Sequence, residues 1–507
     1  MKTIFCALGF GVLGFAQVGL LGGSATWKND GGGKWKEEKK WVPTSGLNAI
    51  YPDGRDDVAT FPPFILSKPA NISLDGVVDI RSVVFNSEYL YTLTSGQLNV
   101  YESILVTGKA EIHSLLQLEN TIVISANITN PNCSRENDYC LISGEISGNG
   151  GIIKKGQAKL SLSGMHSYRG MTTVQSGILE ALGKNVFSPV SGVVLLNTSG
   201  VVFDLNNFDN TIANLSGGGI LGGNILLGTG TLTVGDDMNT VYCGSIFGEG
   251  GLVKVGIGCL TLSGAKNSFA GPINIQNGTL RAGIVDAFPA SSSIEIANID
   301  GAVLDLACKN CTIPSLNGGG MIGGEVRLGN AILTLAGDSD STIDGTISGI
   351  GGITKNGKGV LTLSRLSTYS GPTLISEGTF ILTGMIGSSV TINPSATLQG
   401  SGIIVGDVKN LGLCKPDKMV VVGNYTQGSD STLEVNLESN ESLTTTGKFI
   451  IGDNVILNIA PPSTFTSGSS YEIVSAGGGI VGSFATLKFP DKYKIIVSMH
   501  NIMIELK

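Results

Sequence analysis

Apolar and polar residues alternate over short runs along most of the chain, and glycine, asparagine or serine separates one run from the next. A typical run is Leu260-Thr261-Leu262, in which the two leucines fall on one side of an extended chain. A period of two predicts β-strands that bury one face, and the intervening residues predict tight turns. These runs show no helical period. The pattern therefore predicts an all-β protein.

The same series of strands and turns occurs three times. The opening glycines of the three copies are Gly148, Gly248 and Gly349, so the period is 100 and then 101 residues. A second block, Gly217–Gly223, returns as Gly318–Gly324 after another 101 residues. Repeats of short strands predict a solenoid, in which each coil packs only on its neighbours. Since one coil takes roughly 20 to 25 residues, each repeat should contain about four or five coils.

The residues of each copy resemble a known family. The order Gly-x-Gly-Gly, Lys, Leu-Thr-Leu-Ser-Gly, Tyr-x-Gly and Gly-Thr-Leu resembles the autotransporter-associated β-strand repeat, also called the passenger-associated transport repeat, over about 35 residues. In the first copy these positions are Gly148–Gly151, Lys154, Leu160–Gly164, Tyr168–Gly170 and Gly177–Leu179. The resemblance implies a right-handed parallel β-helix of the kind found in secreted bacterial surface proteins. It implies no enzymatic activity.

The C-terminal part also resembles this family, and the chain end departs from it. The order of motifs from Val390 to Phe484 resembles the end of autotransporter passengers. A complete autotransporter continues with a translocator barrel, whereas this sequence stops at Lys507 without one. We therefore expect either separate export machinery or a soluble relative that reuses only the stalk.

Changes of pattern divide the chain into five predicted segments. They are a signal peptide at 1–25, a tryptophan-rich N-terminal cap at 26–66, degenerate β-helix coils at 67–145, the three-fold repeats at 146–387, and a passenger-end-like β-helix region at 388–507.

The first segment has the features of an export signal. Met1-Lys2 precedes the uncharged run Ile4–Leu21, and Gly23-Ser24-Ala25 supplies the small residues of a cleavage site. The alternative is an uncleaved membrane anchor, since the run is nearly long enough to span a bilayer. Its glycines and Gln17 weaken that alternative. We therefore expect an exported protein.

All three tryptophans, Trp27, Trp35 and Trp41, lie in the second segment. An open solenoid end exposes apolar core and unpaired strand edges, so we predict that these side chains cap the first coil. The alternative is a surface platform on which sugars stack.

Composition agrees with a solenoid and limits the partners. The 507 residues include 74 glycines, and 14% are charged, against about 25% in ordinary globular proteins. The net charge is -8 and no basic cluster is present, which argues against nucleic acid as a partner. His113, His166 and His500 are the only histidines. We predict no catalytic, metal-binding or cofactor-binding residue.

Seven cysteines remain in the expected mature chain. An exported protein can oxidise them, so Cys133 with Cys140 and Cys308 with Cys311 are candidate local bridges. The second pair also has the spacing of half a zinc site or of a redox pair, but it has no second pair of ligands. Loop bridges or buried thiols are the preferred interpretation. The seven are Cys133, Cys140, Cys243, Cys259, Cys308, Cys311 and Cys414.

Two acidic pairs fall at similar places in the repeats. Asp236-Asp237 and Asp338 with Asp340 each follow a strand and a glycine. Such carboxylates can bind calcium or cleave polysaccharides. A turn after glycine selects acidic residues in any case, and the Gly-Gly-x-Gly-x-Asp calcium repeat is absent. We interpret both pairs as turn residues.

Tyr168, Phe269 and Tyr369 recur at one position of the repeat. Four or five coils lie between successive members, so these rings cannot stack on each other. We predict that they fill the core or its corners.

Together these features predict an exported bacterial stalk at the cell surface or outer membrane, or secreted, with an adhesin-like or structural display role and no catalysis. Its partner would be a surface ligand, such as a host protein or a glycan, bound by lateral faces and loops. One alternative is a polysaccharide-degrading β-helix enzyme, which predicts carboxylates or basic residues clustered across neighbouring coils. The other is a passive cell-envelope scaffold, which predicts self-association.

Overall fold

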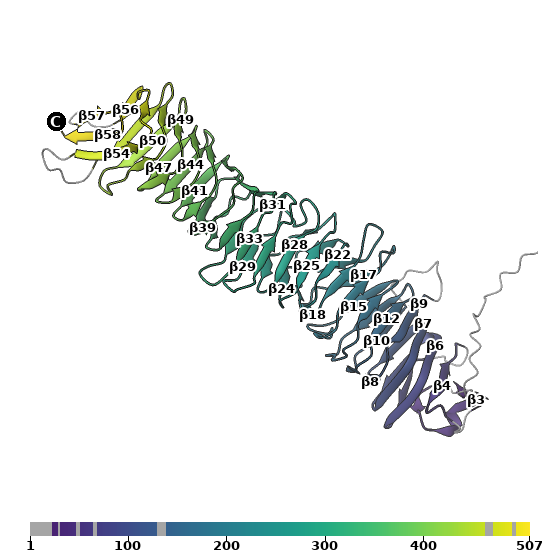
Figure 1. Cartoon of the computed structure of the whole chain (residues 1–507). Coiled ribbons are helices and arrows are strands. Elements are labelled where there is room, and N and C mark those ends of the chain that lie inside the picture. The colour runs from purple at the N-terminus through teal and green to yellow at the C-terminus, as the bar shows by residue number, and fades with distance from the viewer. Residues whose placement is uncertain are drawn as a thin grey trace, which may run out of the picture.

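The protein is an elongated rod in which coils of short β-strands stack on one another. The computed structural model describes residues 23–28, 31–46, 51–63, 68–128, 138–461, 470–488 and 493–506. Strands stack along the rod from the N-terminal end to the C-terminal end (Figure 1), and they form a β-solenoid of about 19 turns. Within the described residues the one helical element is a 3-10 turn, η1 (Glu38–Lys40). The predicted all-β, parallel β-helix is confirmed.

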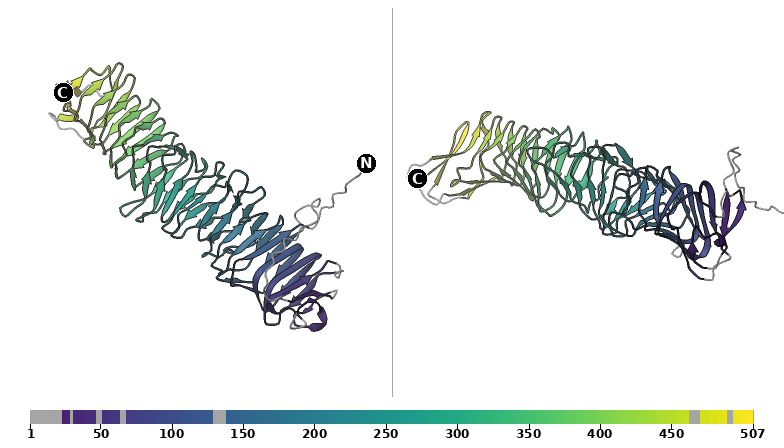
Figure 2. Two further views of the ribbon diagram at one scale, coloured as in Figure 1. Left: turned by 45° about the vertical axis from the view of Figure 1, so that its right-hand side comes forward. Right: turned by 90° about the horizontal axis from the view of Figure 1, so that it is seen from below.

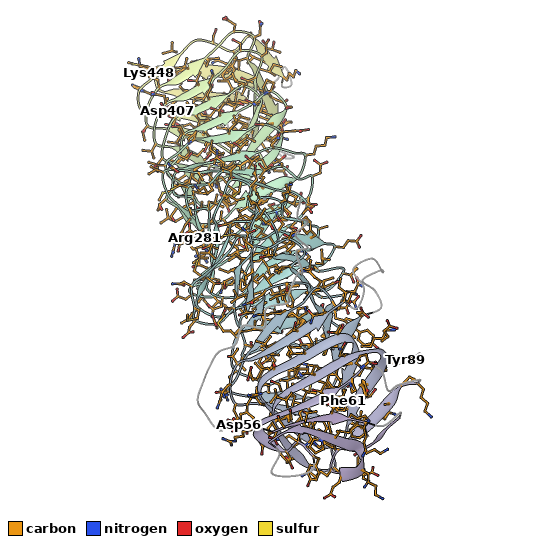
Figure 3. All side chains as sticks on the ribbon, turned by 90° about the vertical axis from the view of Figure 1, so that its right-hand side faces the viewer. Asp56, Phe61, Tyr89, Arg281, Asp407 and Lys448 are labelled. Carbon is orange, nitrogen blue, oxygen red and sulfur yellow. The ribbon has the colours of Figure 1, made fainter. Side chains whose placement is uncertain are left out.

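Aromatic side chains fill the N-terminal end. Strand β1 (Ser24–Trp27) pairs antiparallel with β3 (Trp41–Ser45) and parallel with β4 (Gly54–Phe61). The rings of Trp27, Trp35 and Trp41 pack against one another, with Phe61 beneath them, and all four are buried. Figure 3 shows Phe61 in these first turns. The buried indoles close the open end of the core and offer no face on which a sugar could stack.

Strand β1 bears on the predicted signal boundary. Residues 1–22 lie outside the described part of the chain, and β1 begins at Ser24. Ala25 is buried and lies beside Ala59 of β4. Cleavage after Ala25 would remove the first two residues of β1, whereas cleavage before Gly23 would leave the strand whole. The exact boundary stays a prediction.

The first turns, predicted as degenerate β-helix coils, contain long continuous strands that extend around the corners of the solenoid. Strands β6 (Val77–Thr94) and β7 (Gln97–Ile112) pair in parallel, with irregularities after Ile80 and Ser87. No glycine or proline interrupts β6. The chain therefore rounds its corners through local bulges without losing the strand hydrogen bonds.

Three faces are defined by the partners of β7. Its three parts pair with β8 (Leu115–Leu118), β9 (Ile122–Asn127) and β10 (Tyr139–Ile142). We call the faces that continue from these strands face 1, face 2 and face 3. Later turns visit the faces in this order, and alternate side chains of each strand point into the common core. Figure 2 shows the stacked faces from two further directions.

The repeat does not complete a whole number of turns. From β12 (Ile152–Lys155), four turns along face 2 lead through β14 (Thr172–Val174), β16 (Val193–Leu195) and β19 (Leu215–Gly217) to β22 (Thr240–Tyr242). The next strands, β23 (Ile246–Gly248) and β24 (Leu252–Lys254), lie on face 3 and face 1. Strand β24 opens the second repeat, so one repeat spans four and two-thirds turns.

Equivalent strands therefore lie on different faces. The repeats open with β12 on face 2, β24 on face 1 and β37 (Gly352–Lys355) on face 3. At about 4.8 Å per stacked strand, each repeat advances about 22 Å and is rotated by one-third of a turn from the previous repeat. The predicted four or five coils per repeat are confirmed, and the rotation is an additional finding.

The other end of the rod finishes with antiparallel strands. On face 2 the last turns reach β51 (Leu443–Thr445) and β54 (Ser470–Ala476), which pair in parallel. Strand β58 (Asn501–Leu506) then pairs antiparallel with both β54 and β57 (Tyr493–Val497). No helix among the described residues is long and apolar enough to cross a membrane.

One glycine of each repeat occupies a corner where two turns almost touch. Gly177, Gly278 and Gly378 have φ angles of 72°, 66° and 75°. A methyl group on Gly177 would lie 2.4 Å from the carbonyl oxygen of Gly156 on the preceding turn. These positions require glycine for its backbone angle and for its lack of a side chain.

We expect Gly177→Ala to reduce the free energy of unfolding by about 3 kcal/mol, because the left-handed backbone strain adds to the clash with the Gly156 carbonyl. Gly200→Ala is the matched control: its φ angle is 81°, but the nearest atom to an added methyl group is 3.8 Å away. The control should lose only about 1 kcal/mol. Urea unfolding followed by circular dichroism measures both, and equal losses would contradict the close-contact explanation.

Candidate functional site

The repeat lysine is buried in all three copies. Lys154, Lys254 and Lys355 stand on β12, β24 and β37, and their exposed fractions are 0%, 2% and 2%. Each lies two residues after an inward-facing apolar residue, so its side chain also points into the rod. This lysine is part of the sequence motif, but its burial was not predicted. Its alternation with the inward-facing Ile152 was the signal that could have indicated it.

The ammonium groups bind carbonyl oxygens at a corner of the core. Lys154 Nζ donates to the carbonyls of Lys155, Gly156 and Ser176 at 2.7, 2.8 and 3.0 Å. Because Ser176 lies on the following turn, the lysine joins two turns of the solenoid. Lys254 repeats the arrangement with Val255, Gly256 and Asn277 at 2.6, 2.8 and 3.2 Å, and Lys355 donates to Gly357 at 2.6 Å.

Burial and hydrogen bonding act in opposite directions on these lysines. Loss of hydration lowers the pKa of Lys154 to about 7 and that of Lys254 to about 8, and it also lowers the pKa of Lys355. Three carbonyl acceptors match the three N–H bonds of the protonated group, which favours the charge. The role is structural, because the lysine nitrogen donates to carbonyls that would otherwise be buried without a donor.

A hollow of about 480 Å³ opens on face 1 across four successive turns. Met165 is largely exposed at its mouth, and Phe187 lies buried at its base. Glu145 Oε1 accepts a hydrogen bond from Ser167 Oγ at 2.8 Å. Apolar walls with a few polar groups are typical of ligand sites. The lining residues are Glu145, Met165, His166, Ser167, Asn185, Phe187, Pro189 and Thr211.

His166 beside this hollow has a corner role that the repeats share. Its Nδ1 accepts the N–H of Ile146 at 3.0 Å. Asn267 does the same for Ile246 in the second repeat, and Ser367 does so for Ile347 in the third. Burial lowers the pKa of His166 to about 4, so the ring is neutral near pH 7. Its Nε2 then carries the proton and has no partner in the described structure.

The other two histidines make contacts of different kinds. His113 Nε2 lies 3.0 Å from Glu111 Oε2, and His500 Nδ1 lies 2.9 Å from the carbonyl of Ala476. A serine nucleophile would require a hydrogen bond between its hydroxyl and a histidine ring. Within the described residues, none of the three histidine rings makes such a bond.

The acidic pairs act as turn residues. Asp236 accepts from the backbone N–H of Met238 at 2.9 Å, and Asp338 and Asp340 accept from those of Lys358 and Val360 at 2.9 and 2.8 Å. Within the described residues, no group of three or more His, Cys, Asp or Glu could hold a metal ion. These carboxylates thus anchor the backbone of the same or the next turn.

A row of polar side chains crosses neighbouring turns on face 3, as the enzyme alternative would require. Lys159 Nζ and Ser161 Oγ bond the two oxygens of Glu180 at 2.6 and 2.7 Å, and Tyr139 donates to Glu111 at 2.8 Å. The carboxylates are thus engaged by neighbouring turns. In the second repeat Arg281 Nε takes up a similar contact with Asp305 at 2.9 Å, and Figure 3 shows Arg281 on the outside of the rod.

The cysteines are free wherever the structure describes them. Cys308 is exposed in a turn, whereas Cys311 is buried at the start of β31 (Cys311–Ile313), so the candidate bridge between them is wrong. Burial raises the pKa of Cys311 to about 11 and that of Cys140 to about 12, which makes both thiols unreactive. Cys140 is free, and Cys133 lies outside the described residues.

The repeated aromatic residues are in the core, as predicted. Tyr168, Phe269 and Tyr369 are fully buried. The hydroxyl of Tyr168 lies 2.6 Å from Thr172 Oγ1, and that of Tyr369 lies 2.7 Å from Thr373 Oγ1. The rings fill equivalent corners on three different faces.

Comparison with known proteins agrees with the fold. The passenger-associated-transport-repeat family model matches residues 152–181, 252–282 and 353–382. The chain is 39% identical over 160 residues to the adhesin BmaC autotransporter of Brucella suis biovar 1 (strain 1330), a match that covers 31% of this chain and 5% of that protein. It is 25% identical over 411 residues to the uncharacterized protein YuaQ of Escherichia coli (strain K12), covering 72% of this chain and 29% of that protein.

A shorter match is to an extracellular serine protease of Serratia marcescens, with 43% identity over 58 residues. It covers 11% of this chain and 6% of the protease. The chain thus spans less than one-third of the length of each of these three relatives. The fold and the three family matches define a β-solenoid of the passenger type. The chain is an autotransporter passenger-like protein with passenger-associated transport repeats.

We expect Lys154→Met to lower the free energy of unfolding by about 2 to 4 kcal/mol, because three buried carbonyls lose their donor. Lys155→Met is the matched control, since Lys155 is the exposed neighbour on the same strand. Denaturant unfolding should show little change for this control. An equal loss in both variants would contradict the proposed role of the buried ammonium.

The same lysine should make stability depend on pH. Its folded pKa of about 7 lies below its unfolded value of 10.5, so the unfolded chain binds more protons between these values. The free energy of unfolding should therefore rise as pH increases from about 7 to about 10.5, and this contribution is lost as pH falls through 7. Melting temperatures of the native chain across this range should rise more steeply than those of Lys154→Met. Parallel curves would show that burial does not shift the lysine pKa.

Proposed function

We propose that the protein is an exported, non-catalytic stalk that displays adhesive surfaces on its sides. The observation that carries this proposal is the combination of a passenger-type solenoid with the hollow on face 1. Parallel strands hold each turn to the next, so side chains from separate turns keep fixed positions relative to one another. Similarity to an autotransporter named as an adhesin supports the same role.

The hollow is the proposed ligand site. Met165, Phe187 and Pro189 supply an apolar wall, and Glu145 and Asn185 supply polar atoms at its edge. A pyranose ring presents an apolar C–H face and hydroxyl groups around it, so a glycan has the amphipathic character that this lining suits. The volume of about 480 Å³ has room for a small saccharide. Binding through one such site would be weak, and display of many copies would strengthen it.

Export can be tested on intact cells that produce the chain. An external protease should trim the mature chain while a periplasmic marker stays whole, or the chain should appear in the medium. Protection that persists until the envelope is opened would contradict surface display.

Ligand binding can be tested with the purified chain on a glycan array. We expect Met165→Lys to reduce binding to any recognised glycan at least tenfold, because it places a charge at the apolar mouth of the hollow. Met238→Lys is the matched control, since Met238 is also exposed but lies outside the hollow. If the array recognises no glycan, or both variants bind equally well, the hollow is not the glycan site.

A further inference from the structure

The repeated block Gly217–Gly223 forms a rigid turn with two exposed aliphatic side chains. The exposed fractions of Ile220 and Leu221 are 93% and 65%. Gly219 N donates to the carbonyl of Gly222 at 2.9 Å and closes the turn. Leu221 N donates to Asn197 Oδ1 at 2.8 Å and fixes the turn to the preceding coil. Large apolar groups held in water in a defined position are typical of interaction sites.

Neighbouring strands extend this apolar surface. Leu226 on β20 (Asn224–Leu226) and Val241 on β22 are both exposed. Cys243 is exposed too, and its N–H donates to the carbonyl of Gly217 at 2.7 Å. We call this set the apolar corner; its residues are Ile220, Leu221, Leu226, Val241 and Cys243.

Charged residues are sparse around the apolar corner, although Lys266 is exposed in the same corner of the coil after Cys243. The sequence holds no charged residue from Asn210 to Val234, and none in Asn197–Gly200 on the preceding coil. The nearest acidic neighbour by strand pairing is Asp204, which lies beside Leu226. The five residues of the apolar corner are themselves uncharged, whereas the chain as a whole has a net charge of -8.

The second repeat contains the same turn in a different setting. Met321 and Ile322 are 82% and 70% exposed. Gly320 N bonds the carbonyl of Gly323 at 2.8 Å, and Ile322 N bonds Asn298 Oδ1 at 2.9 Å. The backbone of the turn is therefore reproduced.

Its flanks, however, are charged. Strand pairing places Arg327 where the first repeat has Leu226, and Asp344 where it has Cys243. Arg327 also forms an ion pair with Glu325 at 2.6 Å. The same turn therefore occurs with charged neighbours in one repeat and with uncharged neighbours in the other. The second repeat can thus serve as a comparison for the first.

We propose that the apolar corner is the site at which a second copy of this chain docks, with the same corner of both copies in contact. Two copies of an acidic chain repel each other wherever their charged surfaces meet, so an uncharged apolar area is where they can approach closely. Contact of one surface with itself gives a closed two-fold pair. The one-third-turn rotation directs the charged counterpart to another side of the rod.

The contact is small. A standard interface buries about 800 Å² of surface on each partner, and five side chains bury less than this. Pairing should therefore be reversible and should require micromolar or higher concentrations. Moderate salt should strengthen it, because salt screens the repulsion between acidic copies while leaving the apolar contact in place.

Sedimentation velocity of the purified full chain, with a reducing agent present, tests this proposal. We expect a concentration-dependent dimer between about 1 and 200 µM, and at least a tenfold weaker association for Leu226→Arg with Cys243→Asp. These substitutions copy Arg327 and Asp344 and leave the turn itself intact. The matched control is Met321→Ser with Ile322→Ser, which should dimerise like the native chain. A native chain that is monomeric throughout, or a control that is equally weakened, would overturn the proposal.

Cross-linking locates the contact. A short bismaleimide reagent should join two copies through Cys243, so Cys243→Ser should abolish the cross-linked product. Cys308→Ser should retain it, because Cys308 is the other cysteine that is exposed among the described residues. Product that depends on Cys308 would place the contact elsewhere. If the chain stays monomeric but the corner variant binds cells less well, the corner docks on another protein and pairing is wrong. The sedimentation and cross-linking results on the purified chain depend neither on export nor on glycan binding.

Discussion

Hydrogen bonding between successive turns is the interaction on which the structure depends. A solenoid has no globular centre, so each turn is stable only when its backbone groups pair with the turns on both sides. Straight segments satisfy this through parallel strands, but corners bring carbonyls together without partners. The buried ammonium of Lys154 supplies those partners, and Gly177 allows the next turn to approach. One charged side chain and one missing side chain thus complete the backbone pairing.

The sequence predicted the features that follow from local alternation and from the repeat. Leucines and isoleucines at alternate positions identified the solenoid, and the spacing of Tyr168 and Tyr369 identified core aromatics. The burial of Lys154 was missed, since lysine in water is a surface residue and only neighbouring turns supply its acceptors. The rotation of the repeat was also missed, because it depends on how many residues each corner uses. The hollow on face 1 combines four turns, which local pattern cannot align.

Repeats fix the interior of this protein and leave its exterior free to vary. Positions that bind across turns keep their chemistry, as Lys154, Lys254 and Lys355 show. Outward positions at the same corner differ completely, as Leu226 and Arg327 show. An outward side chain contributes little to the pairing of turns, so its replacement leaves the stack intact. A scaffold of this kind can therefore acquire separate surfaces on one rod.

The incomplete last turn of each repeat has a consequence for how such chains change in length. Unequal recombination between two copies would add or remove about 100 residues and leave the strand ladders continuous. Everything beyond the junction would nevertheless swing by 120° around the long axis. Only a change of three copies, which is 14 turns or about 67 Å, would restore the original bearing. Gain or loss of one repeat therefore changes the direction in which the distal surfaces face around the long axis, without altering a residue on those surfaces.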